Sequence, residues 1–167
     1  MISKDIKNTE EIAKKFLKQI SKQNKTATVV GLYGDLGTGK TTFTQMMAKT
    51  LGIKRKVNSP TFVIMKKYIL PLPKGSARRA RGSKSPLLIP PLRRGGEFKY
   101  LFHIDAYRLK NEKELLALGW GEMILSPENL IFIEWPENIK KAMPKKHHQI
   151  HIKHTKEGYR KFEIKNV

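Results

Sequence analysis

Residues 34–41 read Gly34-Asp35-Leu36-Gly37-Thr38-Gly39-Lys40-Thr41, which matches the pattern G-x-x-x-x-G-K-[ST] in full. In this pattern the glycines let the backbone turn so that successive N–H groups point inward at phosphate oxygens. The lysine, here Lys40, reaches the β- and γ-phosphates, and the hydroxyl of the next residue, Thr41, coordinates magnesium. The stretch therefore predicts a phosphate-binding loop for a nucleoside triphosphate, with Mg²⁺ as the cofactor.

The sequence on either side of this loop has the context that the motif needs. Residues 28–33 (TVVGLY) are a short, apolar, β-branched run of the kind found in buried parallel strands. A helical pattern starts at about Lys40 and ends near Gly52, a residue type common just after a helix. The positive end of that helix dipole would face the same phosphates, which favours anion binding.

Strand and helix patterns alternate along the rest of the chain. Capping-box-like pairs predict helices from Asn8 to about Lys22 and from Asn111 to about Gly119. Apolar and alternating runs predict strands at 62–70, 100–105 and 130–134, and a hairpin of strands at 149–153 and 159–165. We therefore expect residues 1–167 to form one α/β domain: a three-layer P-loop NTPase-like fold with a mixed, mostly parallel sheet and a C-terminal antiparallel strand pair.

Residues 71–96 (PLPKGSARRARGSKSPLLIPPLRRGG) differ from the rest of the chain in composition. They hold five of the nine Pro and five of the eight Arg, and no acid. Such a segment cannot bury enough apolar surface to offset its ordering entropy, so we expect a disordered, basic insert. Its residue types favour GC-rich codons whereas those of the remainder favour AT-rich ones, which indicates an inserted, translated repeat element. An arginine-rich RNA-binding arm is the alternative.

The overall composition bears on location and partners. The chain has no cysteine, which fits a reducing cytosol, and it has neither a signal-peptide core nor an apolar run of roughly 20 residues. We therefore expect a cytoplasmic protein without a membrane partner. The formal net charge of +20 favours anionic partners. However, 26 of the 34 basic residues are Lys, so a general lysine bias explains the charge equally well.

A triphosphatase also needs acids that hold magnesium and orient water. Asp105 and Glu134 each end an apolar run, and ligands of open α/β sheets bind at the carboxyl ends of strands. Both acids would lie at the loop if their strands run parallel to residues 28–33; otherwise they are solvated strand-end residues. Trp135 follows Glu134 directly, which predicts a place near the nucleotide. GTPases carry the motif D-x-x-G at the second acid and N-K-x-D late in the chain. Asp105 does not begin D-x-x-G, and N-K-x-D is absent late in the chain, so we expect ATP rather than GTP.

Four stretches, in this order, resemble the TsaE (YjeE-type) family of bacterial ATPases. They are GDLGTGKTT at 34–42, NSPTF at 58–62, HIDAYRL at 103–109 and IEWPE at 133–137. The resemblance covers about residues 9–70 and 99–152. The phosphate loop alone is shared by hundreds of families, whereas the ordered combination is much more specific.

The resemblance implies an accessory ATPase for the threonylcarbamoyl modification of adenosine 37 in tRNA. It implies that ATP hydrolysis resets a complex of two partner proteins, TsaB and TsaD, and that any tRNA contact is indirect. It leaves the tasks of Tyr107 and Arg108 open. Motif and resemblance together predict the catalytic residues Lys40, Asp105 and Glu134, and the magnesium ligands Thr41, Asp105 and Glu134. They predict Thr61 as a switch-like residue. The predicted ATP contacts are Asp35, Leu36, Gly37, Thr38, Gly39, Lys40, Thr41, Thr42 (at the α-phosphate) and Trp135.

Two other classes of function stay open at this point. A small-molecule kinase shares the loop, and Arg78, Arg79 and Arg81 of the insert would imitate the arginines of a kinase lid, although they lack a helical frame. An RNA-binding module that uses ATP as a switch fits the charge. Against that class, the sequence has no RNA-recognition signature, and few aromatics lie among its basic residues.

Overall fold

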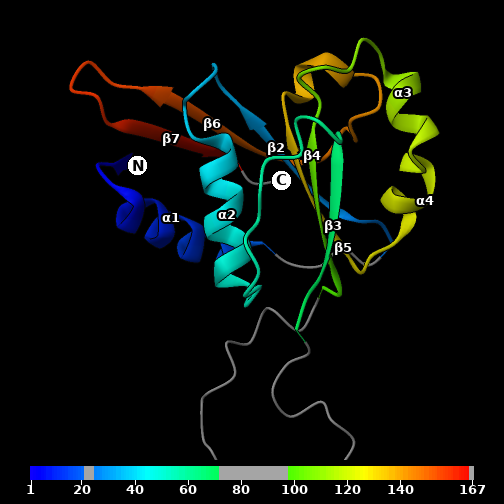
Figure 1. Ribbon diagram of the computed structural model, residues 1–167, viewed down its shortest axis with the longest axis horizontal. Coiled ribbons are helices and arrows are strands. Elements are labelled where there is room, and N and C mark those ends of the chain that lie inside the picture. The colour runs from blue at the N-terminus through cyan, green and yellow to red at the C-terminus, as the bar shows by residue number, and fades with distance from the viewer. Residues whose placement is uncertain (21–24, 72–97, 166–167) are drawn as a thin grey trace, which may run out of the picture.

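The computed structural model describes residues 1–20, 25–71 and 98–165. Its helices and strands follow one another in chain order (Figure 1) as β1 (Ile2–Ser3), α1 (Ile6–Gln19), β2 (Thr28–Tyr33), α2 (Lys40–Thr50), β3 (Met65–Ile69), β4 (Tyr100–Asp105), α3 (Glu112–Ala117), α4 (Trp120–Leu125), β5 (Asn129–Glu134), the 3-10 helix η1 (Pro136–Ile139), β6 (His148–His154) and β7 (Arg160–Lys165). Within the described residues, the strands form one sheet in the order β1-β7-β6-β2-β5-β4-β3.

The sheet is mixed, as predicted. Strands β6, β2, β5 and β4 run parallel and form its centre. Strands β7 and β1 on one side and β3 on the other pair antiparallel to their neighbours, and β6 with β7 is the predicted C-terminal antiparallel pair. The parallel direction on which the prediction for Asp105 and Glu134 depended is therefore confirmed.

Helices cover both faces of the sheet, which confirms the three-layer prediction. Helices α1 and α2 contribute Phe16 and Phe43 to a core that also contains Phe132 of β5. On the other face, α3 and α4 contribute Leu115 and Trp120 to a second core. Figure 1 shows the two helix pairs on opposite sides of the sheet. Burial of both faces explains why β2 and β5 are mostly apolar.

The first helix begins earlier than predicted. Asp5 is its N-cap, and the Asp5 carboxylate accepts a hydrogen bond from Asn8 N at 2.7 Å. Asn8 lies within the first turn, where its Oδ1 accepts from Lys4 N at 3.2 Å. Asn8 thus occupies the N3 position of a capping box, although it accepts from the residue before the N-cap, and the prediction that it opens the helix was wrong. Helix α1 ends at Gln19 instead of near Lys22, which lies outside the described residues.

Three other elements differ from the sequence prediction. Strand β3 starts only at Met65, because Phe62 and Val63 lie in an exposed turn in which Val63 N donates to Pro60 O at 2.8 Å. Helix α4 was missed, and the buried Trp120, just beyond the predicted end of the preceding helix near Gly119, is its first residue. Strand β1 was also missed, because two residues carry no periodicity.

The predicted basic insert, residues 71–96, lies outside the described residues except for Pro71. The described residues on either side of it are neighbours in the fold, because Leu70 N donates to Lys99 O at 2.9 Å. In the described part of the chain, no helix has the length and apolar character to span a bilayer.

Candidate functional site

The loop at 34–41 connects the end of β2 to the start of α2. Gly34 has φ = +139°, and a Cβ there would lie 2.1 Å from the carbonyl oxygen of Ile152 on β6, so only glycine fits. Gly39 has φ = +100° and is the N-cap of α2. The Thr38 hydroxyl donates to Asp35 O at 2.8 Å and closes the turn. The turn leads directly into the N-terminus of α2, the end of a helix that favours an anion.

Lys40 is folded into this loop and is only 4% exposed. Its Nζ donates to Gly34 O at 2.5 Å and to Asp35 O at 2.9 Å, and it lies 3.8 Å from the centroid of the Trp135 ring. Burial lowers the pKa of Lys40 below its ordinary value, and the field of Glu134 opposes that shift. The ammonium group is thus held at the loop by neutral acceptors and an aromatic face, where phosphate oxygens would be stronger partners.

Glu134 ends β5 beside the loop and is 3% exposed. The Thr41 hydroxyl donates to its Oε1 at 2.9 Å and to its Oε2 at 3.0 Å. His103 of β4 lies with its Nε2 at 2.6 Å from the same Oε1. A buried carboxylate needs such donors, because its desolvation is otherwise very costly. The structure therefore brings two of the predicted magnesium ligands, the Thr41 hydroxyl and the predicted catalytic acid Glu134, into direct contact.

Asp105 lies beside Glu134, since the two residues are Cα partners at the ends of β4 and β5. One carboxylate oxygen of Asp105 accepts from the Thr61 hydroxyl, and the other accepts from Tyr107 N at 3.0 Å. The Thr61 hydroxyl is also 2.6 Å from Ser59 Oγ. The predicted switch residue and the predicted metal ligand are thus hydrogen-bonded, although 44 positions separate them in the chain.

The segment after Thr61 has an unusual backbone. Ile64 has φ = +63°, a genuine outlier for a β-branched residue, and such a conformation costs on the order of 1–3 kcal/mol. Its carbonyl accepts from Asp105 N at 2.9 Å, which ties this conformation to the site. Just before it, Phe62 is 85% exposed, with the Arg108 guanidinium 4.8 Å from its ring centroid. Arg108 therefore packs on the turn that carries Thr61.

Trp135 also has positive φ, at +58°, where the chain leaves β5 for η1. Its ring lies over Lys40 and packs against Tyr107, with the two ring centroids 5.1 Å apart. The structure thus places Trp135 at the loop and shows a contact for Tyr107 that sequence reasoning did not find.

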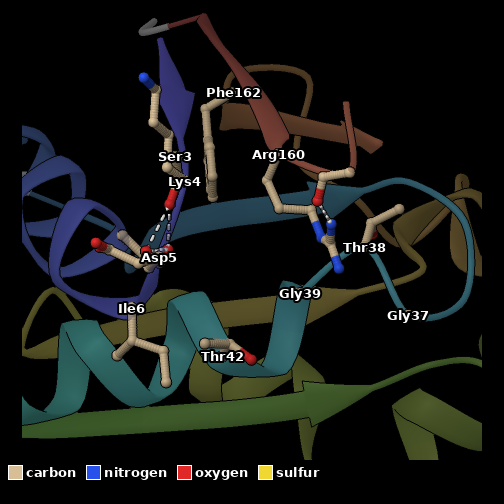
Figure 2. Close-up of a pocket in the computed structure, with 12 residues that line it drawn as sticks. Ser3, Lys4, Asp5, Ile6, Gly37, Thr38, Gly39, Thr42, Arg160 and Phe162 are labelled. Atoms are coloured by element: carbon tan, nitrogen blue, oxygen red, sulfur yellow. Dashed lines mark hydrogen bonds between the residues drawn. The ribbon is translucent and has the colours of Figure 1, made fainter. Parts of the chain in front are cut away.

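Sequence reasoning also missed a pocket of about 270 Å³ on the other side of the loop (Figure 2). Figure 2 shows Arg160 extending from β7 toward the loop, with the first residues of the chain as the opposite wall. The Arg160 guanidinium is anchored by a 2.8 Å hydrogen bond from Nη1 to Gly158 O. No local pattern predicts a pocket built from both ends of the chain. Its lining residues are Ser3, Lys4, Asp5, Ile6, Thr9, Gly37, Thr38, Gly39, Thr42, Gly158, Arg160 and Phe162.

The predicted magnesium ligands are two buried carboxylates and a hydroxyl, grouped at the mouth of the loop. Oxygen donors of this kind suit Mg²⁺, which proteins usually bind through one or two carboxylates together with substrate phosphates. In the described part of the chain, here or elsewhere, no group of three His, Cys, Asp or Glu side chains is placed to hold an ion. Thr41, Asp105 and Glu134 therefore fit the ion that the loop implies.

The fold and the loop together define a P-loop NTPase-like α/β domain. The chain belongs to the TsaE family, since the family model described as threonylcarbamoyl adenosine biosynthesis protein TsaE matches residues 3–75 and 89–162. The match extends beyond the two ranges that carried the sequence resemblance. It leaves out residues 76–88, which lie within the basic insert.

Two relatives and one solved structure agree with this assignment. The tRNA threonylcarbamoyladenosine biosynthesis protein TsaE of Bacillus subtilis is 33% identical over 142 residues, which are 83% of this chain and 70% of the relative. The protein of the same name from Rickettsia bellii is 31% identical over 165 residues, 98% of this chain and 95% of the relative. The crystal structure of Bacillus subtilis YdiB has a TM-score of 0.66 and 28% identity, covering 100% of this chain and 84% of that one.

Proposed function

We propose that this protein is a magnesium-dependent ATPase that serves threonylcarbamoyladenosine synthesis on tRNA. One observation carries the proposal: the Thr41 hydroxyl, at the start of α2, contacts both carboxylate oxygens of the buried Glu134 on β5. A loop that only binds phosphate has no need of a desolvated acid at this point, whereas hydrolysis needs one to orient water. The names of the relatives, each a tRNA threonylcarbamoyladenosine biosynthesis protein, support the pathway.

Each residue has a role that follows from its position. Lys40 would exchange its carbonyl partners for the β- and γ-phosphates, and Thr41, Asp105 and Glu134 would hold the magnesium ion. When bound, that ion neutralises charge that develops on the phosphates. Glu134 would orient the attacking water. Thr61, which is hydrogen-bonded to Asp105, would respond to the γ-phosphate.

The nucleoside of ATP would occupy the pocket of Figure 2, because Thr42 and the loop glycines form one of its walls. Arg160 would supply positive charge there, beside the α-phosphate contact expected of Thr42. Selection of ATP over GTP rests on the absence of the GTPase motifs from the sequence.

We further propose that this ATPase acts on the TsaB–TsaD complex, which its hydrolysis resets between turnovers, and that its contact with tRNA is indirect. The exposed Phe62, Val63 and Tyr107 support a protein partner at this site, because the first two follow Thr61 in the chain and Tyr107 packs against Trp135. A partner at this surface would sense the phosphate end of the nucleotide.

ATP hydrolysis measured with and without the two partner proteins tests the proposal. Lys40→Ala should reduce turnover by about 10² to 10³, roughly 3–4 kcal/mol of barrier, because one preorganised charge contact is lost. Lys54→Ala, at an exposed lysine outside the loop, is the matched control. Turnover that survives in Lys40→Ala would contradict the assignment of the loop. Phosphoryl transfer to a small acceptor in place of hydrolysis would favour the kinase alternative.

A further inference from the structure

His103 is a fully buried residue with no role in the mechanism described so far. It lies on β4 opposite Phe132 of β5, and two positions further along the same pair of strands Asp105 lies opposite Glu134. Because side chains alternate across a sheet, all four point to the face that α2 covers. The His103 and Glu134 side chains are diagonal neighbours on that face, with Nε2 and Oε1 2.6 Å apart.

Only one of the two nitrogens of this imidazole has a hydrogen-bond partner among the described residues. Its Nε2 contacts Glu134, whereas its Nδ1, equally buried, has no hydrogen-bond partner among the residues that the structure describes. Buried polar atoms are nearly always bonded, so an unbonded one requires an explanation. An apolar side chain would fill this core position without leaving a nitrogen unbonded. The Nε2 contact with Glu134 is therefore the feature that distinguishes histidine here.

The two donors on Glu134 differ in how freely they move. Thr41 shares one hydroxyl proton between both carboxylate oxygens, and this hydroxyl is also the group expected to turn toward magnesium. His103 contacts Oε1 alone, from a ring enclosed in the sheet with 0% exposure. If the Thr41 hydroxyl turns to the metal, His103 remains as the fixed donor on this carboxylate.

We infer that His103 is a positioning residue, which anchors Oε1 of Glu134 by an N–H donated from Nε2 and thereby leaves Oε2 oriented toward the nucleotide site. This inference rests on the proposed ATPase function. It assigns the tautomer with the proton on Nε2, because no acceptor for an Nδ1 proton is present among the described residues. When a residue that orients a group of the site through a hydrogen bond is lost, activity typically falls by 10- to 100-fold.

Two substitutions distinguish the loss of the hydrogen bond from His103 to Glu134 from a change in core packing. His103→Leu keeps an apolar core but removes the donor, whereas His103→Gln places an amide N–H at about the reach of Nε2. We expect turnover to fall by about 10- to 100-fold in His103→Leu and to recover largely in His103→Gln, with nucleotide affinity unchanged in both. Ile104→Val is the matched control, because it trims the opposite face of the same strand. If His103→Leu does not fold, His103→Asn replaces it, since its shorter amide does not reach Glu134.

A second measurement does not depend on activity. The imidazole nitrogen signals of His103 in an NMR spectrum of labelled histidine, assigned by their loss in His103→Gln, should show protonation on Nε2 and should shift in Glu134→Gln. Wild-type turnover in His103→Leu, or equal losses of turnover and melting temperature in both variants without rescue, would overturn the inference. If the wild-type protein hydrolyses no ATP, the proposed function fails first. The NMR spectra then test the hydrogen bond between His103 and Glu134 independently of activity. Unchanged His103 signals in Glu134→Gln would refute it.

Discussion

The hydroxyl of Thr41 donates to both carboxylate oxygens of Glu134, at 2.9 and 3.0 Å, across 93 positions of sequence. This contact joins the first turn of α2 to the end of β5, so that a change at either residue alters the other.

Glu134→Gln and Asp105→Asn should impair different steps. Glu134→Gln should slow hydrolysis by about 10² or more while nucleotide still binds, because binding rests on the loop and catalysis on an oriented water. Asp105→Asn should raise the magnesium concentration needed for half-maximal turnover, because a ligand charge is lost, and it should loosen Thr61. Turnover titrated against magnesium, together with nucleotide affinity, separates the two. Intact hydrolysis in Glu134→Gln would refute its assigned role.

Trp135 should report nucleotide through its fluorescence. Its ring lies 3.8 Å from Lys40 Nζ, so emission should change when phosphates draw that ammonium group away. Trp120 fluorescence should not change, because this residue is buried at the start of α4 and its Nε1 donates a hydrogen bond to Ala142 O at 3.0 Å. ATP titration of Trp120→Phe should therefore give a signal, and titration of Trp135→Phe should give none. The reverse pattern would place the nucleotide away from Trp135.

Glu10 links α1 to α2 and should make stability depend on pH. It pairs with Lys14 at 2.8 Å and with Lys49 at 2.6 Å, and these hydrogen bonds lower the pKa of Glu10 to about 2. Because this folded-state pKa lies below the unfolded value near 4.5, the stabilisation is complete above about pH 4.5. It is lost as the pH falls toward 2.

The melting temperature of Glu10→Gln should therefore be slightly below that of the wild type at pH 7. The difference should shrink as the pH falls toward 2 and as salt is added, since both side-chain partners are more than half exposed. Glu11→Gln, at the neighbouring exposed acid, is the control. A difference that grows at low pH would contradict the assignment.

Replacing residues 72–97 by Asn-Gly should leave ATP binding and hydrolysis near wild type. The hydrogen bond between Leu70 and Lys99 shows that β3 and β4 are already adjacent where the segment begins and ends, so a short turn can join them. The shorter connection should stabilise the fold by at most about 1–2 kcal/mol, because the cost of loop closure grows only logarithmically with length.

Three assays on this variant distinguish the alternatives for the insert. Normal basal activity without stimulation by TsaB–TsaD would show that the segment belongs to the partner interface. Loss of basal activity would favour the kinase alternative, with the segment as a lid. A shallower salt dependence of tRNA binding would support the arginine-rich arm.

The sequence alone was sufficient for the phosphate loop and for the class of fold. Residues 34–41 are contiguous, and the backbone of a glycine-rich turn follows from its own residues, as the positive φ of Gly34 and Gly39 illustrates. The apolar runs of β2, β4 and β5 could be predicted for a similar reason, since strands buried on both faces are mostly apolar. Thr61, in contrast, was reached only through resemblance to a family.

Only the tertiary structure decided which side chains meet at the loop. Strand β5 lies between β2 and β4 although it follows both in the chain, and this order places Glu134 beside Thr41 and within reach of His103. The pocket at Arg160 depends likewise on pairing of β1, at the start of the chain, with β7 near its end. Such contacts arise from sheet topology and from the burial of both faces. They join residues far apart in sequence and leave no periodic trace in the segments that make them.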